Sequence, residues 1–315
     1  MHPALTGMKL SVLIKTHNHE AFVDQTLESV LAQRADFAWE IVVADDCSTD
    51  GTRTRLHALQ ALHPERIRIL EREKNLGPVR NFVEALAACR GGYIALLDGD
   101  DYWLTTDKLQ QQVSLLETTP ELSACTHDAR IVDARGGLLA ERYCSPTLPS
   151  RLGVERILRG NPVPAGALTF RRDRLEPLPE WFEELPFSDW ALHVLLALRG
   201  PIAYLPEVMM AYRKHRHGMW SVREEADRLR LTIDCCSLFA RTLRRPWARR
   251  AAARQARLQL RLALVEARGE GRRVRWSAVS EAFRTAGSAA PELLFSRAFR
   301  RLLPHLLHGP AAGER

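Results

Sequence analysis

Short apolar runs alternate with amphipathic segments over the first 120 residues of this 315-residue chain, and this alternation limits the fold more than any other feature. The runs have the length of buried strands, and the segments between them have the spacing of helices with one apolar side. The strand-like runs are 11–15, 40–44, 66–70 and 93–97, and the helical segments are 22–32, 52–62 and 79–89. This order predicts an α/β domain with a mostly parallel sheet and right-handed crossovers.

The pattern becomes less regular after Pro120. We expect strands at 123–132, 138–142, 167–171 and 202–205 and a helix at 189–198. Beyond residue 224 the chain is rich in Arg, Ala and Leu with helical spacing, which predicts an α-helical C-terminal extension.

Three carboxylates follow the fourth predicted strand directly: Asp98, Asp100 and Asp101. They therefore lie at the carboxyl edge of the sheet, where open α/β sheets bind ligands. Carboxylates this close raise each other's pKa unless a cation neutralises them. The cluster predicts a divalent cation, Mn²⁺ or Mg²⁺, and the alternative is an acidic turn that caps the next helix.

Polar residues also follow the first two strands, and a parallel sheet brings them beside the acidic cluster. Asp46 can accept a hydrogen bond from the N3–H of a uracil or thymine ring, and His17 can stack on that ring. The alternative is that Asp45 or Asp50 and Ser48 only form turns and cap the second helix. This interpretation is favoured for Asp50 but not for Asp46.

The net charge of +7 favours an anionic partner, and its excess is concentrated between Arg241 and Arg275, where 12 arginines accompany two acidic residues. No nucleic-acid motif accompanies them, so we expect no nucleic acid. Leu258, Leu262 and Val265 form an apolar stripe on one predicted helix. It either contacts an anionic membrane surface or packs on the protein or on a second subunit, and packing is favoured.

Four motifs, in this order, resemble the family 2 glycosyltransferases of the GT-A fold. They are Ser11–Ile14 with Thr16–Asn18, Val43–Thr52, Asn75–Gly77 and Asp98–Asp101. Each is weak alone, but their order and spacing are specific. The Asp-Gly-Asp-Asp-Tyr-Trp segment at 98–103 is similar to that of a bacterial subgroup of the family.

The resemblance covers about residues 8–222, which it implies are a GT-A catalytic domain, with 223–315 as the helical extension. It implies a UDP- or dTDP-sugar donor, Mn²⁺ or Mg²⁺, inversion at the anomeric carbon, and a glycan or lipid-linked acceptor in cell-surface polysaccharide synthesis. With no apolar run long enough to span a membrane and no signal peptide, we expect a cytoplasmic protein. Peripheral contact with the inner membrane surface and a homodimer through the C-terminal helices stay open.

The resemblance also implies roles for individual residues. Asp46 matches the acid that recognises the pyrimidine, whereas His17 stands where many members have an aromatic residue. The remaining donor contacts that it implies are Thr16, Asn18, Arg80 and Asp98, with Asp98 near the ribose and Asp100 on the metal.

Further along the chain, Asp189 matches the catalytic base, with Asn161 and Trp190 in the acceptor region. His215 is implied as a second metal ligand. Arg213 and Trp220 are implied as a diphosphate contact and a lid residue.

Two other functions remain open at this point. A nucleotidyltransferase would need a Gly-rich, basic loop after the first strand, where this chain has His-Asn-His-Glu-Ala at 17–21. A non-catalytic sugar-nucleotide-binding protein would hold Asp189 far from the donor site.

Overall fold

The computed structural model describes residues 7–220, 222–269, 274–287, 290–294 and 296–307. The chain forms two compact units. The first comprises residues 1–183 and 187–215, and the second comprises residues 184–186 and 216–315.

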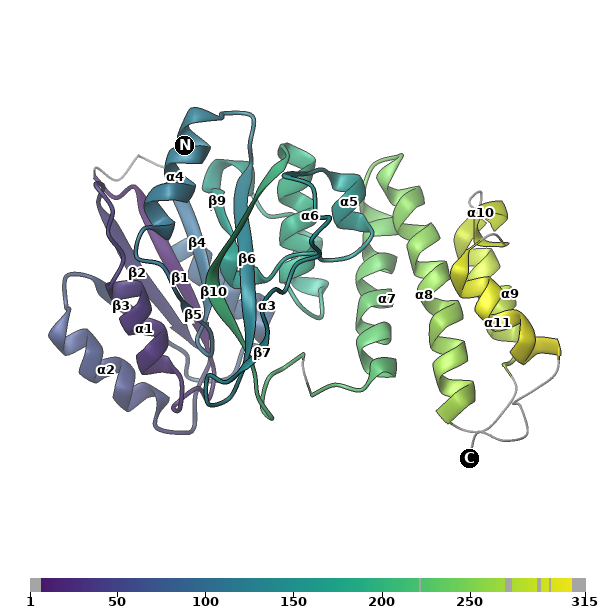
Figure 1. Cartoon of the computed structure of the whole chain (residues 1–315), viewed down its shortest axis with the longest axis horizontal. Helices are drawn as coiled ribbons and strands as arrows, with labels where there is room; N and C mark the ends of the chain where they lie inside the picture. Colours follow the sequence, from purple (N-terminus) through teal and green to yellow (C-terminus); the bar gives the residue numbers. More distant parts are fainter. Residues whose placement is uncertain (1–6, 221, 270–273, 288–289, 295, 308–315) are drawn as a thin grey trace. The chain divides into compact units, whose positions relative to one another are not determined.

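One mixed sheet organises the first unit (Figure 1). Its strands are β1 (Leu10–Thr16), β2 (Trp39–Asp45), β3 (Ile67–Glu71), β4 (Tyr93–Asp98), β5 (Tyr102–Trp103), β6 (Ala124–Asp133), β7 (Leu138–Ala140), β8 (Arg151–Leu152), β9 (Thr169–Arg171) and β10 (Ile202–Lys214). Their order is β3-β2-β1-β4-β9-β6-β10-β5, with β7 beside β6 and β8 beside β10. Strands β3, β2, β1 and β4 are parallel, and β9 is antiparallel to both neighbours. The mixed, mostly parallel sheet is therefore confirmed.

Helices of the first unit connect these strands. They are α1 (Val23–Leu31), α2 (Thr52–Leu62), α3 (Pro78–Ala88), α4 (Lys108–Thr118), α5 (Val154–Leu158) and α6 (Asp189–Arg199), with 3₁₀ turns at Ala165–Ala167, Arg172–Arg174 and Glu180–Glu184. Apolar residues of α1, α2 and α4 share one core with alternate residues of β1, β2 and β4, among them Val12, Ile14 and Val43. Burial of these apolar side chains therefore fixes the positions of the strands whose ends form the polar edge of the sheet.

Strand β10 is longer than the sequence predicts. The expected strand at 202–205 stops at Pro206, which lacks the N–H that a strand interior needs. In the structure the pairing with β6 shifts register between Leu205 and Met210 and then continues to Lys214. The bulge absorbs the proline, and the strand carries its last residues to the carboxyl edge of the sheet.

The second unit is helical, as predicted. It contains α7 (Glu225–Thr242), α8 (Trp247–Gly269), α9 (Trp276–Ala286), α10 (Ala290–Leu294) and α11 (Arg297–Leu307). Leu260 and Ala263 of α8 share a core with Val279 and Ala282 of α9. The predicted stripe of Leu258, Leu262 and Val265 is only half-buried, so the buried face of α8 lies beside it. Within the described residues, no helix combines the length and the apolar character needed to cross a membrane.

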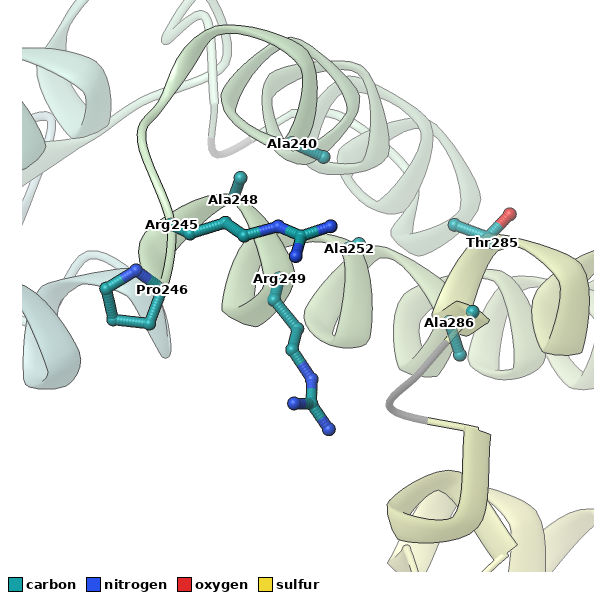
Figure 2. A pocket seen from close by; sticks show the side chains of 9 residues that line it. Ala240, Arg245, Pro246, Ala248, Arg249, Ala252, Thr285 and Ala286 are labelled. Carbon is teal, nitrogen blue, oxygen red and sulfur yellow. The ribbon is translucent and has the colours of Figure 1, made fainter.

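A pocket of about 410 Å³ opens among the ends of α7 and α9 and the start of α8 (Figure 2). Its lining is Ala240, Arg245, Pro246, Ala248, Arg249, Ala252, Thr285, Ala286 and Gly287. Small side chains form its walls, and two arginines supply its only charges among these lining residues.

Lys108, the first residue of α4, is fully buried in the first unit. Its ammonium nitrogen lies 4.2 Å from the centroid of the Trp103 ring and 3.3 Å from Thr169 Oγ1. No carboxylate pairs with it in the described residues, and burial lowers the pKa of Lys108 to about 7.

We predict that Lys108→Met stabilises the protein at neutral pH by about 1–3 kcal/mol, because burying the ammonium costs more than its two contacts return. The unfolded chain binds the Lys108 proton up to about pH 10.4, so the wild-type free energy of unfolding rises from about pH 7 to 10.4. Urea unfolding across this range measures the difference between the two proteins. Lys9→Met, which removes a partly exposed lysine paired with Glu117, is the control. A Lys108→Met protein less stable than wild type at pH 7 would contradict the prediction.

Candidate active site

The carboxyl edge of the sheet brings three distant residues together. Strands β1 and β4 pair in a register that places Lys15 opposite Asp98, so both side chains emerge on the same face. The Lys15 ammonium nitrogen is 3.1 Å from Asp98 Oδ1 and 3.2 Å from Asp189 Oδ1. Asp189 is the first residue of α6 and comes from 174 positions along the chain. Lys15 was not among the site residues predicted from the sequence, although a charged residue at the end of an apolar strand, in a sheet whose neighbouring strand ends in acids, was the signal.

This contact changes the proton affinities of all three groups. Burial alone would lower the pKa of Lys15, but the two carboxylates raise it. Burial alone would raise the pKa of Asp189, yet the Lys15 ammonium holds it below its usual value. For Asp98, burial outweighs Lys15 and raises the pKa to about 6, with Asp189 and Asp100 adding to the effect. Asp189 is therefore a carboxylate at neutral pH.

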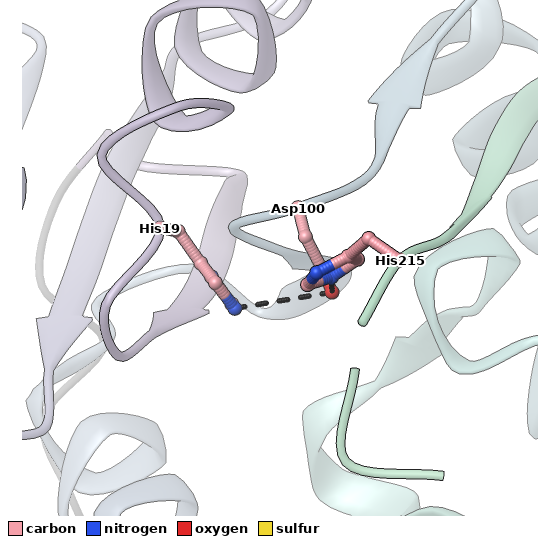
Figure 3. Close-up of side chains that lie close together, drawn as sticks. All are labelled: His19, Asp100 and His215. Atoms are coloured by element: carbon pink, nitrogen blue, oxygen red, sulfur yellow. Dashed lines mark hydrogen bonds and ion pairs between the residues drawn. The ribbon is translucent and has the colours of Figure 1, made fainter. Parts of the chain in front are cut away.

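His19, Asp100 and His215 form a group whose ligand atoms all lie within 4.8 Å of one another (Figure 3). His215 Nε2 is 2.9 Å from Asp100 Oδ2, and His19 Nε2 is 3.8 Å from the same oxygen. His19 lies on the loop after β1, and His215 directly follows β10. Burial lowers the pKa of His19, which favours the neutral ring that binds metals. Asp100 and His215 were predicted from the sequence as metal ligands, whereas His19 was not.

These side chains fit a divalent cation. One carboxylate oxygen and two imidazole nitrogens suit first-row transition metals such as Mn²⁺ better than Mg²⁺, which prefers oxygen ligands. The longest distance that joins them leaves room for an ion between the three atoms.

Arg213 holds the loop that carries Asp100. Its Nε donates to the Asp100 carbonyl (2.8 Å), Nη1 to the Ala134 carbonyl (3.1 Å) and Nη2 to Gln25 Oε1 (2.6 Å). Its own backbone amide donates to Asp101 Oδ1 at 2.8 Å. Arg213 is 5% exposed, so these contacts anchor the loop after β4, which carries Asp100, to β10. Its predicted diphosphate contact stays a prediction.

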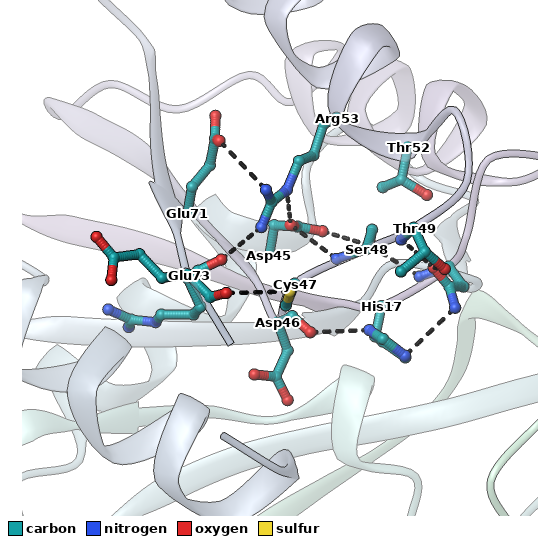
Figure 4. A network of polar contacts seen from close by, with 12 residues as sticks. His17, Asp45, Asp46, Cys47, Ser48, Thr49, Thr52, Arg53, Glu71 and Glu73 are labelled. Carbon is teal, nitrogen blue, oxygen red and sulfur yellow. Dashed lines mark hydrogen bonds and ion pairs between the residues drawn. The ribbon is translucent and has the colours of Figure 1, made fainter. Parts of the chain in front are cut away.

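The loops after β1 and β2 are joined by side-chain hydrogen bonds (Figure 4). The backbone N–H of Asn18 donates to Ser48 Oγ (2.9 Å), and the backbone N–H of Thr49 donates to the side-chain Oδ1 of Asn18 (2.7 Å). Asn18 has a φ of 55°, a left-handed conformation that asparagine tolerates. Asp50 Oδ1 accepts the backbone N–H of Thr52 (3.0 Å), so Asp50 forms the predicted turn before α2, whose N-cap is Gly51.

Asp46 directly follows β2, and its carboxylate contacts the backbone just before α3. Its carboxylate accepts the backbone amides of Leu76 (2.7 Å) and Gly77 (3.0 Å), and each oxygen keeps a second lone pair. His17 is fixed beside it, with Nδ1 2.8 Å from the Asp46 carbonyl oxygen. Hydrogen bonds therefore fix Asp46 and His17, the two residues predicted to bind the base, and the Asp46 carboxylate can still accept a further donor.

The other predicted donor residues occupy different settings. Thr16, the last residue of β1, is 3% exposed, and its Oγ1 lies 3.2 Å from His19 Nδ1. This contact links the end of β1 to the His19–Asp100–His215 group. Arg80 is an exposed residue of α3 whose Nε lies 3.2 Å from Glu84 Oε1.

The residues predicted near the acceptor lie on or against α6. Trp190 is 2% exposed and donates from Nε1 to the Ile157 carbonyl (2.8 Å). Asn161 Oδ1 is 2.8 Å from His193 Nδ1, one helical turn after Asp189. Both residues hold the helix that presents Asp189. Trp220 belongs to the second unit and is 40% exposed.

Solved structures share this fold. The S. aureus TarS 1-349 complex with UDP-GlcNAc matches with a TM-score of 0.66 and 18% identity over 95% of this chain and 89% of that chain. The Pyrobaculum calidifontis mannosyltransferase PcManGT, in complex with GDP-Man and Mn²⁺, matches with a TM-score of 0.55 and 18% identity over 96% and 86%. The fold is therefore the GT-A nucleotide-diphospho-sugar transferase fold, with a helical C-terminal extension.

The family follows from the sequence itself. The model of glycosyl transferase family 2 matches residues 11–178, which is more than half of the chain. This protein belongs to glycosyl transferase family 2.

Two curated relatives illustrate the range of the family. An uncharacterized protein of Mycobacterium tuberculosis is 36% identical over 217 residues, which are 67% of this chain and 60% of that protein. The putative teichuronic acid biosynthesis glycosyltransferase TuaG of Bacillus subtilis is 37% identical over 107 residues, 34% of this chain and 41% of that protein.

We predict that Arg213→Met lowers the free energy of unfolding by about 2 kcal/mol or more, because it leaves buried carbonyls without their charged donor. Guanidinium chloride unfolding measures the loss. Arg80→Met, which removes an exposed arginine with one helical ion pair, should change stability by less than about 0.5 kcal/mol. Equal effects of the two substitutions would show that Arg213 does not anchor the loop after β4.

Proposed function

We propose that this protein is a metal-dependent, inverting glycosyltransferase. It moves a sugar from a UDP-sugar, or a dTDP-sugar, to a hydroxyl group of a glycan or lipid-linked acceptor. The observation that carries the proposal is the meeting of Asp98, Lys15 and Asp189 at one edge of the sheet, next to the His19–Asp100–His215 group. Family membership and the UDP-GlcNAc complex of the structurally similar TarS support it.

The donor nucleotide binds across the ends of β1, β2 and β4. Asp46 accepts the N3–H of the pyrimidine and His17 contacts the ring, with Thr16, Asn18 and Arg80 around them. Asp98 contacts the ribose. Uracil and thymine present the same N3–H, so the base pocket accepts both.

Asp189 acts as the general base. Its carboxylate takes the proton of the acceptor hydroxyl while the hydroxyl oxygen attacks the anomeric carbon from the face opposite the diphosphate. This single displacement inverts the anomeric configuration. Its low pKa, caused by Lys15 against the effect of burial, keeps it ready to accept a proton at neutral pH.

His19, Asp100 and His215 would hold Mn²⁺, with Mg²⁺ less favoured by the two imidazoles. When bound there, the cation would supply positive charge for the diphosphate leaving group, which would then need no general acid. Arg213 keeps Asp100 in place, and Trp220 is proposed as a lid residue over the acceptor.

The two rival functions receive less support. The loop after β1 contains no Gly-rich, basic segment for a nucleotidyltransferase. A non-catalytic sugar-nucleotide-binding protein would not need Asp189 near the donor site. Here Lys15 contacts both Asp189 and Asp98, the proposed ribose contact.

We place the reaction in the synthesis of a bacterial cell-surface polysaccharide, at the cytoplasmic face of the inner membrane. The similarity to TuaG supports this setting. Residues 8–222 are the proposed catalytic domain, and 223–315 are an extension that either contacts the membrane or forms a homodimer. Arg245 and Arg249 line its pocket and suit an anionic surface.

Donor hydrolysis and transfer across UDP-, dTDP- and GDP-sugars with Mn²⁺ or Mg²⁺ test the function. We expect turnover of a UDP- or dTDP-sugar. Asp189→Asn should keep UDP binding and lose transfer on the order of 100-fold or more, because no base remains. Asp173→Asn, which makes the same change at an exposed residue of the 3₁₀ turn at Arg172–Arg174, is the matched control and should retain most activity. Absence of turnover with every pyrimidine donor, with and without bacterial acceptor extract, would overturn the proposal.

His19→Gln should weaken Mn²⁺ binding by about 10-fold or more, whereas Mg²⁺ binding, which gains little from an imidazole, should change less. Calorimetry and electron paramagnetic resonance of bound Mn²⁺ in the presence of UDP measure this without reference to activity. His57→Gln changes an exposed histidine paired with Glu71 and is the control. Unchanged Mn²⁺ affinity in His19→Gln would exclude His19 from the metal site.

A further inference from the structure

Lys15 contacts two carboxylates that have separate duties in the proposed reaction, and no motif assigns it a role. Its ammonium nitrogen is 3.1 Å from the donor-side Asp98 and 3.2 Å from the proposed base Asp189. We propose that Lys15 is a positioning residue that fixes the Asp189 carboxylate against the donor site and orients it toward the acceptor hydroxyl. This inference rests on the proposed function.

The position of the ammonium group is set by the sheet. Lys15 lies on β1, which pairs with β2 on one side and β4 on the other, and its side chain is 14% exposed. Asp98 is its direct partner in the pairing with β4. Asp189, in contrast, begins a helix that the sheet register does not fix. The ammonium group therefore transfers the rigidity of the sheet to the start of α6.

The contacts of Asp189 divide its two oxygens. Lys15 Nζ and Ser188 Oγ, at 3.2 and 3.4 Å, both approach Oδ1. In the described part of the chain no group donates to Oδ2, and the side chain is 34% exposed. Oδ2 is thus the oxygen left to accept a proton, and its direction is set by the contacts at Oδ1.

The step balances without a change at Lys15. The acceptor O–H proton passes to Asp189 Oδ2, and the acceptor oxygen forms a bond to the anomeric carbon. The bond from that carbon to the diphosphate oxygen breaks, and its electron pair leaves with the nucleoside diphosphate. Lys15 stays protonated and holds Oδ1. Without it, the Asp189 carboxylate loses its fixed neighbour while Asp98 stays available to the donor.

The test is Lys15→Met, a side chain of similar length without charge, in the full chain. Its substrate is the pyrimidine nucleotide sugar that the wild type turns over, with water as the acceptor. We expect kcat to fall on the order of 100-fold, because misplacing a reacting group by about 1 Å has an effect of this size. We expect KM for the donor and UDP affinity by calorimetry to stay within about threefold, since Asp46 and the metal group remain.

Two further variants separate positioning from folding. Lys15→Arg keeps a cation between the acids and should restore kcat to within about tenfold of wild type. Lys9→Met removes the lysine just before β1 and should leave kcat and KM unchanged. If Lys15→Met does not fold, Lys15→Gln takes its place with the same expected split between kcat and KM.

Wild-type kcat in the uncharged variant would overturn the inference. A parallel loss of kcat and UDP affinity, with no rescue by Lys15→Arg, would also overturn it and leave Lys15 a structural residue. If the wild type turns over no nucleotide sugar, the proposed function itself fails, and this outcome is distinct because it precedes any comparison of variants.

Discussion

The register of β1 between β2 and β4 is the constraint on which the site depends. Val12 and Ile14 are fully buried, and they alternate along the strand with residues of the opposite face. A shift of one residue would turn Lys15 toward the apolar core and move it away from Asp98. The burial free energy of the sheet therefore fixes a charged group at the edge, and no local interaction of the loop has to do so.

Strand β10 completes the site from a segment that lies more than 100 residues after β4. It passes through the bulge at Pro206 and ends beside the loop after β4. Arg213 then binds the backbone of Asp100 while His215 approaches its carboxylate, so one strand end supplies both the anchor of the loop after β4 and a member of the proposed metal site. A loop with three acidic residues would repel itself in isolation, and these two contacts hold it in one conformation.

The sequence predicted what depends on local pattern. Asp98 and Asp100 were located because they follow an apolar run, and the turn formed by Asp50 follows from the residue types of its own segment. Lys15 and His19 were missed because their roles depend on partners 174 and 196 positions away, which no spacing encodes. The length of β10 was missed because a bulge that accommodates Pro206 arises from its pairing with β6.

Lys15 and the proposed metal ion are two cations that suit different tasks. In the proposed reaction Asp189 must stay an anion, so its counter-ion has to be present in every state of the protein, and a covalently attached ammonium on a buried strand meets this need. The negative charge of the diphosphate is present in the site only while the donor is bound. One carboxylate and two imidazole ligands would leave a bound divalent ion with net positive charge to meet it. If a second lysine replaced the metal ion, the site would attract anions permanently. If a metal ion replaced Lys15 beside Asp189, it would occupy the carboxylate lone pair that has to accept the acceptor proton.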